Sequence, residues 1–201
     1  MDSTGQYIDH LMHLASQTKG VLSTKDVVRA GIPKSAFYAF LEINQFERIG
    51  RGIYLSPDAW LDGMYVLSLR SPQSIFSHET ALYLHDLTHR EPIQYSVTLP
   101  TGYNPSKLVA DGITVYTVKR ELLHMGMTEK VTPFGHTVRV YDMERTVCDI
   151  VRSRKKGEAQ TLQDALHHYT RRSDKHIGSL LHYARIFQVE KILNTYLEVL
   201  L

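Results

Sequence analysis

The first 44 residues predict three helices, two of them from apolar residues at helical spacing. A stripe from Tyr7 to Ala15 predicts a first helix, and Gly20 is the kind of residue that commonly ends one. A second, shorter helix is expected just after Ser23 or Thr24, because either side-chain oxygen can cap its free N–H groups. The third helix is expected from about Lys34 to Asn44.

The third predicted helix has one apolar and one polar side. Phe37, Phe40 and Leu41 lie on the side that we expect to face a core. Two helices joined by a short turn containing glycine form a helix-turn-helix, whose second helix has the shape to enter a major groove. The side of the third helix left for such a contact carries Lys34, Ser35, Tyr38 and Glu42.

Two short strand patterns follow this helix directly. Residues 46–49 and 53–55 are predicted strands, and Gly50-Arg51-Gly52 joins them with glycines that suit a tight hairpin. Arg51 then stands at the tip of a wing, where it can reach a phosphate or a narrow minor groove. This order of elements predicts that residues 1–58 form a winged helix-turn-helix DNA-binding domain.

The polar side of the third helix and the hairpin supply the candidate DNA contacts. Lys34, Ser35 and Tyr38 are expected to contact bases or phosphates, with Arg48 and Arg51 on the backbone or minor groove. The alternative is a protein-interaction module that no longer binds DNA, which the balance of six basic and five acidic residues in positions 1–56 favours slightly. The full set of DNA-binding candidates is Lys25, Lys34, Ser35, Tyr38, Arg48 and Arg51.

Residues 59–201 predict a second domain that mixes helices and strands. A helix is expected over 74–87, with Ser74 as its cap. Alternating β-branched residues predict strands at 95–100, 113–118 and 138–141. A helix from about 142 and three further helical stripes complete the chain. The expected fold class is α+β: an N-terminal winged helix-turn-helix, then a C-terminal domain of a small mixed sheet with several helices.

The formal net charge of +2 is too small to indicate a type of binding partner, but one region is locally basic. Positions 152–175 hold seven Lys or Arg against three acidic residues. Such a stretch is either an ordinary solvated face or, by hypothesis, a second surface for the DNA backbone or for an acidic or nucleic-acid-bearing partner. Its basic residues are Arg152, Arg154, Lys155, Lys156, Arg171, Arg172 and Lys175.

Several locations and chemistries are disfavoured by what the chain lacks. No apolar run is long enough to cross a bilayer and no secretory signal is visible, so we expect a cytoplasmic protein without a membrane partner. Cys148 is the only cysteine and lies in an apolar helical pattern, which predicts a buried structural thiol.

No pattern predicts an enzyme. The eleven histidines include no His-Glu-x-x-His pair, and no glycine-rich phosphate loop follows a strand. A nuclease site needs an Asp on one strand and Glu-x-Lys on the next. The nearest match pairs Asp111 with residues 117–119, where Thr117 replaces the glutamate. We therefore expect no catalysis, metal or cofactor, and interpret the histidines as structural or surface residues.

Four segments together resemble the AbiEi family, antitoxins and autorepressors of type IV toxin–antitoxin (abortive infection) operons. They are residues 31–38, 46–54, 77–87 and 144–149. The resemblance implies a repressor that binds inverted repeats in the promoter of its own operon. It also implies a role in phage resistance, with residues 59–201 as an antitoxin domain that counteracts a nucleotidyltransferase-like toxin without needing a stable complex.

Overall fold

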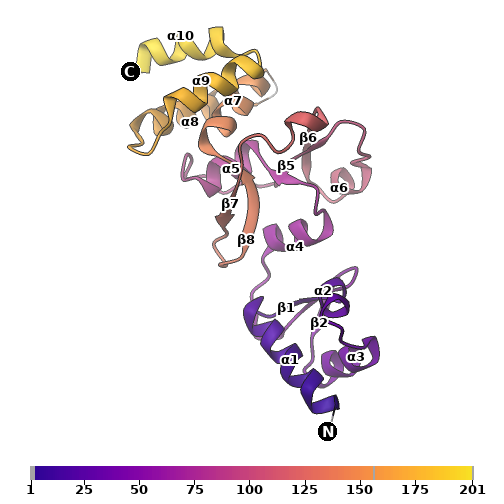
Figure 1. Cartoon of the computed structure of the whole chain (residues 1–201). Coiled ribbons are helices and arrows are strands. Elements are labelled where there is room, and N and C mark those ends of the chain that lie inside the picture. Colours follow the sequence, from indigo (N-terminus) through magenta and orange to yellow (C-terminus); the bar gives the residue numbers. More distant parts are fainter. Residues whose placement is uncertain (1–2, 156, 201) are drawn as a thin grey trace. The chain divides into compact units, whose positions relative to one another are not determined.

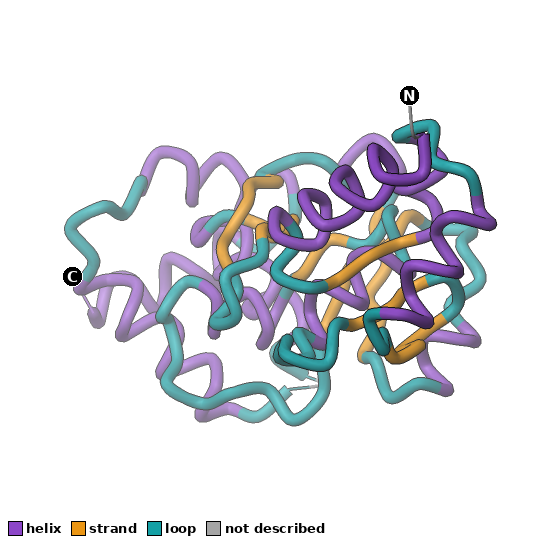
Figure 2. The backbone as a smooth tube through the Cα atoms, turned by 90° about the horizontal axis from the view of Figure 1, so that it is seen from below, coloured by secondary structure: helices purple, strands orange, loops and turns teal. Residues whose placement is uncertain are grey.

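The computed structural model describes residues 3–155 and 157–200, which form two compact units. The first unit comprises Met1–Pro72 together with Thr132–His136. The second comprises Gln73–Val131 and Thr137–Leu201. Figure 2 distinguishes the helices, strands and loops of the chain by colour. Within the described part of the chain, no helix is both long and apolar enough to span a membrane.

The first unit combines four helices with a three-stranded antiparallel sheet (Figure 1). The strands lie in the order β1-β3-β2, so the final strand is central. Its elements are α1 (Ser3–Gln17), β1 (Val21–Ser23), α2 (Thr24–Arg29), α3 (Lys34–Ile43), β2 (Glu47–Gly50), β3 (Ile53–Leu55) and α4 (Gly63–Arg70).

The expected helix ends have a clear physical basis. Ser23 is the N-cap of α2, and its hydroxyl accepts a hydrogen bond from the Asp26 N–H at 3.1 Å. Gly20 follows α1 with a φ of +87°, which favours glycine, and its N–H donates to the Ala15 carbonyl. A Cβ at Gly20 would lie 2.5 Å from the Cβ of Ala59, so glycine is also required sterically.

The apolar side predicted for the third helix forms the core of this unit. Phe37, Phe40 and Leu41 are buried, and they pack in one cluster with Leu11 of α1 and Val27 of α2. Hydrophobic burial therefore fixes α3 against the two preceding helices and leaves its polar side exposed.

The first unit extends past the boundary that the sequence suggests at residue 58. Val66 of α4 packs with Val21, Ile53 and Leu55 beside the three-stranded sheet, so this helix belongs to the first unit. Its N-cap is Asp62, whose side chain accepts from the Tyr65 N–H at 3.1 Å.

The second unit contains a mixed five-stranded sheet in the order β6-β5-β4-β8-β7. β5 and β6 are parallel, as are β4 and β8, while the other two pairs are antiparallel. Its elements are β4 (Ile75–Phe76), α5 (His78–Leu84), β5 (Ser96–Pro100), α6 (Ser106–Ala110), β6 (Thr114–Val118), η1 (Arg120–Leu122), β7 (Met127–Val131), β8 (Thr137–Tyr141), α7 (Met143–Ser153), α8 (Ala159–Arg171), α9 (Ile177–Ile186) and α10 (Glu190–Leu200).

Helix α7 is the centre of the second unit. It contacts α5, α8, α9 and α10, and Met143–Val151 is buried throughout. Asp142 caps it by accepting from the Arg145 N–H at 2.7 Å. The buried carboxylate of Glu144 accepts from the Tyr169 hydroxyl at 3.0 Å and from the His176 N–H at 2.8 Å.

The structure confirms the α+β class and the mixed sheet but corrects one predicted helix. Residues 74–87 do not form a single helix that Ser74 caps. Ile75 and Phe76 instead form β4, the central strand, because both bond to β5 and Phe76 also pairs with β8. The helix begins only at His78. Other elements absent from the prediction are β1, α4, α6, η1 and β7.

Candidate nucleic-acid interface

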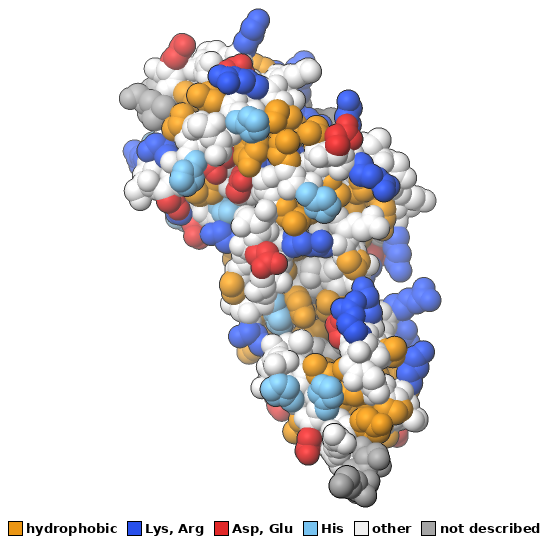
Figure 3. Space-filling model, in the orientation of Figure 1, with side chains coloured by type: hydrophobic (Ala, Val, Ile, Leu, Met, Phe, Trp, Pro, Cys, Tyr) orange, Lys and Arg blue, Asp and Glu red, His pale blue; other side chains and the backbone are white. Residues whose placement is uncertain are grey.

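A groove of about 860 Å³ opens on the first unit, between α2, α3, the β2–β3 hairpin and the end of α4. Lys and Arg side chains gather on the side of this unit where Figure 1 labels α2 and α3 (Figure 3). The groove is lined by Ser23, Thr24, Lys25, Asp26, Lys34, Tyr38, Arg48, Arg51, Gly52, Ile53, Tyr54, Ser68, Leu69 and Pro72.

Five of the six candidate DNA-binding residues line this groove. Lys25 lies in the first turn of α2, whereas Lys34 and Tyr38 project from the exposed side of α3. Arg48 comes from β2 and Arg51 from the hairpin loop. The sixth candidate, Ser35, is exposed in the first turn of α3 but does not line the groove.

The hairpin presents Arg51 through a two-residue connection. Gly50 already belongs to β2 and pairs with Ile53, while Gly52 has a φ of +69°. Only the second of these two glycines therefore provides the positive φ expected for the turn. The Arg48 side chain folds back over the hairpin, where its Nε donates to the Gly50 carbonyl at 3.2 Å.

The groove is much more basic than the unit as a whole. Its lining includes four Lys or Arg side chains and a single carboxylate, Asp26. That carboxylate accepts from the Ser23 hydroxyl at 2.6 Å and lies 3.7 Å from the Arg29 guanidinium. The near-neutral composition of the N-terminal segment thus conceals a one-sided charge distribution, which attracts a polyanion.

Aromatic packing supports the groove wall. The ring of Tyr54 meets Phe37 edge-on, with the centroids 5.5 Å apart, and meets Tyr38 in the same way at 6.4 Å. Burial and the neighbouring Tyr38 raise the pKa of Tyr54 above its usual range. Its hydroxyl is therefore neutral at physiological pH, which is compatible with a site for phosphates.

The sequence pattern missed the part of the groove that α4 contributes. Ser68, Leu69 and Pro72 lie there, beyond the boundary expected at residue 58. A capping signal was present, because Asp62 stands directly before an apolar segment that begins at Met64.

The described basic residues between 152 and 175 are not gathered on one surface. Arg152 and Lys155 lie at the C-terminal end of α7 and line a pocket of the second unit. Arg171 lies at the far end of α8. A helix of 13 residues is about 20 Å long, so α8 separates these two groups.

The remaining residues of this stretch have local partners or lie outside the described residues. Arg172 forms two bonds of 2.8 Å with the carboxylate of Asp174, and the Lys175 Nζ donates to the Arg172 carbonyl at 3.0 Å. Arg154 donates to a carbonyl of its own helix at 3.0 Å. These contacts favour the solvated-face interpretation for this end of α8. Lys156 lies outside the described residues.

His85 and Cys148 have structural surroundings. Nε2 of His85 lies 2.6 Å from the Tyr141 carbonyl. Cys148 is buried, as the sequence predicted, and this burial raises the pKa of its thiol to about 12. Among the described residues, no group of three His, Cys, Asp or Glu side chains is arranged to hold a metal ion.

Acidification is expected to destabilise the second unit through His78. Burial, followed by the charges of Arg152 and Arg145, lowers the pKa of His78 from 6.5 to about 3. Between these two values the unfolded chain binds a proton that the folded chain does not. The contribution of His78 to stability therefore falls as the pH falls, by up to about 1.4 kcal/mol per pH unit.

Denaturant unfolding at about pH 7 and about pH 5 tests this expectation. The His78→Asn variant is the control, because Asn tolerates the positive φ of 48° at this position and does not titrate. Burial raises the pKa of Asp149, which acts in the opposite direction in both proteins. Equal pH dependence in the wild type and the variant would contradict the assignment to His78.

Comparison with known proteins supports the regulatory interpretation of the first unit. Residues 9–57 match the family model described as "Transcriptional regulator, AbiEi antitoxin". The chain also resembles the crystal structure of the RV2827C protein from Mycobacterium tuberculosis, with a TM-score of 0.58 and 13% sequence identity over 90% of this chain and 71% of that one. At this identity the likeness shows a shared fold alone. No curated protein matches the chain. The family match therefore covers residues 9–57 of the first unit and supports an AbiEi-type antitoxin regulator.

Proposed function

We propose that this protein represses its own operon by binding inverted repeats in double-stranded promoter DNA. The order of α2, α3 and the β2–β3 hairpin supports a winged helix-turn-helix. One observation carries the proposal: predicted contacts from α2, α3, β2 and the hairpin tip converge on a single basic groove. Such a regulator acts in the cytoplasm, where its operon is transcribed.

The dimensions of α3 suit a DNA duplex. The helix has 10 residues and is therefore about 15 Å long, and the major groove that would receive it is about 12 Å wide. With Lys34, Ser35 and Tyr38 directed at base edges or phosphates, Arg51 of the wing meets the adjacent backbone or minor groove. Inverted repeats then imply two copies of the chain on one operator.

Binding to promoter DNA at several salt concentrations tests this function. We expect Lys34→Gln and Arg51→Gln each to weaken binding and to reduce the slope of log affinity against log salt by about one. Lys107→Gln, at an exposed position of α6, removes the same charge outside the groove and is expected to leave the slope unchanged. A wild-type protein that binds random DNA as tightly as its promoter would refute the repressor function.

The same measurement separates repression from the protein-interaction alternative. A protein-interaction module would bind neither promoter DNA nor random DNA. The Lys34→Gln and Arg51→Gln substitutions would then cause no measurable change in DNA binding. The excess of cations in the groove favours DNA.

We further propose that residues 59–201 provide an antitoxin activity of type IV, which protects against phage by antagonising a nucleotidyltransferase-like toxin. The support is the family description matched by residues 9–57, which names an antitoxin. The test is co-expression of the full chain with the toxin gene of its operon. We expect growth to be rescued equally by wild type and by the Lys34→Gln, Arg51→Gln double variant, because this antagonism requires neither DNA binding nor a stable complex. Growth arrest despite co-expression would contradict the antitoxin activity.

A further inference from the structure

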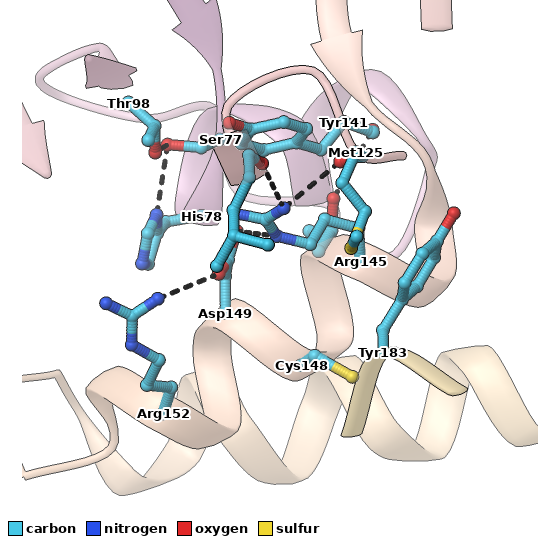
Figure 4. Close-up of polar contacts among 12 residues, drawn as sticks. Ser77, His78, Thr98, Met125, Tyr141, Arg145, Cys148, Asp149, Arg152 and Tyr183 are labelled. Carbon is cyan, nitrogen blue, oxygen red and sulfur yellow. Dashed lines mark hydrogen bonds and ion pairs between the residues drawn. The ribbon is translucent and has the colours of Figure 1, made fainter. Parts of the chain in front are cut away.

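The second unit contains a pocket of about 400 Å³ that the DNA-binding proposal does not use. β5 and β6 form one wall, α7 forms another, and His78 at the start of α5 lies between them. Asp149 lies between the guanidinium groups of Arg145 and Arg152 (Figure 4). Pockets of this size take small organic molecules.

Arg145 supplies a buried and incompletely bonded cation to this pocket. Its side chain is 0% exposed, and its guanidinium lies 4.2 Å from the centroid of the Tyr141 ring and 3.9 Å from that of Phe187. Nε donates to Asp149 at 3.0 Å. Nη1 donates to the carbonyls of Leu122 and Met125 at 3.3 and 3.1 Å.

The other terminal nitrogen of this guanidinium, Nη2, has no hydrogen-bond partner within the described part of the chain. In an arginine fork, Nε–H and one Nη2–H point in parallel, so this nitrogen faces the side occupied by Asp149. Both Arg145 and Asp149 line the pocket, but the Arg145 side chain is 0% exposed, so Nη2 lies beneath the pocket surface. An unpaired buried donor of this kind is costly, so the guanidinium keeps an uncompensated positive charge beside the pocket.

The remaining charges make the pocket a site for an anion. Arg152 lies 3.9 Å from Asp149 and keeps a largely free guanidinium, since 43% of its side chain is exposed. Lys155 is exposed at the same mouth. The lining thus holds three fixed cations and one carboxylate, an excess of two positive charges in a concave, partly buried space.

The backbone conformation and ring contacts of His78 are independent evidence for a ligand site. It adopts a φ of +48°, which is uncommon for a residue other than glycine, and such strain concentrates at ligand sites. Its ring stacks on Tyr116 with the centroids 3.4 Å apart. Its Nδ1 lies 3.0 Å from the Ser77 hydroxyl oxygen, which accepts from Thr98 at 2.9 Å. The aromatic wall is therefore held rigidly beside the cations.

We propose that this pocket binds a small phosphate monoester of about the size of a mononucleotide. A phosphate monoester carries about −1.5 to −2 charges at neutral pH, which matches the excess of two positive charges in the pocket. Its terminal oxygens can accept from the exposed side chains of Arg152 and Lys155, while the buried charge of Arg145 adds to the positive potential of the pocket. The uncharged part of the ligand would lie against Tyr116 and Thr117, which also line the pocket.

Calorimetric titration of the full chain tests the proposal, with 5′-AMP as the probe. Adenosine has the same uncharged part without the phosphate, and inorganic phosphate has the anion alone. We expect 5′-AMP to bind at least about tenfold more tightly than adenosine, a difference of about 1.4 kcal/mol, and inorganic phosphate to compete with it. A chain that binds neither nucleotide nor phosphate, or that binds adenosine equally well, would overturn the proposal. Binding restricted to a 5′-phosphorylated oligonucleotide would also overturn the proposal, because the site would then recognise nucleic acid.

A double variant assigns the binding to this pocket. Arg152→Gln with Lys155→Gln changes two exposed side chains and is expected to weaken 5′-AMP binding at least about tenfold. The charge-matched control combines Arg171→Gln with Lys107→Gln, at exposed positions outside the pocket, and should bind as the wild type does. Equal binding by both double variants would contradict the assignment. Lys34→Gln lies in the other unit and should retain 5′-AMP binding, so a failure of the DNA-binding proposal is distinguishable from a failure of this one.

Discussion

Replacing Arg145 with methionine is expected to lower the free energy of unfolding of the second unit by about 3–5 kcal/mol. Arg145 is fully buried at the centre of this unit and forms an ion pair with Asp149, whose side chain is 3% exposed. Removing the guanidinium leaves the buried carboxylate with only the weaker Arg152 contact at 3.9 Å and deprives the carbonyls of Leu122 and Met125 of their donor. Burial already raises the pKa of Asp149 while Arg145 lowers it, so loss of the arginine raises this pKa further.

Hydrogen exchange of peptides from α5, α7 and α9 would report the loss in the second unit alone. The informative control is the double variant Arg145→Met with Asp149→Leu, in which both charges become apolar side chains. Because a buried ion pair contributes little net stability over a well-packed apolar pair, the double variant should regain most of the loss. If Arg145→Met alone changed protection by less than about 1 kcal/mol, the pair would not be the structural centre that its burial indicates.

Much of the first unit could be predicted from the sequence because its determinants are local. Ser23 caps α2 through a contact three residues away, and Gly20 ends the turn after α1 with its own backbone conformation. The apolar spacing of α3 gave its core side directly. Strand β1 could not be predicted in the same way, because its three residues depend on pairing with Ile53–Leu55, 30 to 34 positions later.

The prediction of a single helix over residues 74–87 was wrong for the same reason, which is that long-range strand pairing decides the local structure. Ile75 and Phe76 are apolar and directly precede a helical pattern, so local spacing assigns them to the helix. Their strand conformation comes from hydrogen bonding to β5 and β8, and Phe76 pairs with Val140, 64 residues away. A short buried strand beside a helix is a case in which tertiary contacts decide the local structure.

The two candidate sites also differ in whether local sequence patterns could predict them. The basic groove was predictable, because Lys34 and Tyr38 lie on one side of a recognisable helix and Arg51 lies in a recognisable hairpin. The pocket of the second unit was not, because His78 and Arg145 belong to elements that meet only in the folded chain. The sequence pattern indicated the charge of Arg152 and Lys155, but their position beside a buried arginine required the structure.

Replacing Asp62 with alanine is expected to destabilise the first unit by about 2–4 kcal/mol. Its carboxylate is 1% exposed and accepts three hydrogen bonds, from the Tyr65 N–H at 3.1 Å, the Thr132 hydroxyl at 2.6 Å and Nδ1 of His136 at 2.8 Å. The His136 ring also stacks on Tyr65, with centroids 4.1 Å apart. Alanine would remove the α4 cap and leave the buried donors of Thr132 and His136 without their acceptor.

Denaturant unfolding of this variant, followed through the fluorescence of Trp60 as the only tryptophan, would measure the loss in the first unit. Asp58→Ala is the matched control, since Asp58 is an exposed aspartate four positions earlier and should change stability by less than about 0.5 kcal/mol. Because α4 lines the basic groove through Ser68 and Leu69, Asp62→Ala should also weaken promoter binding while leaving every basic side chain in place. A variant as stable as Asp58→Ala would show that the three hydrogen bonds of Asp62 do not hold α4 in the first unit.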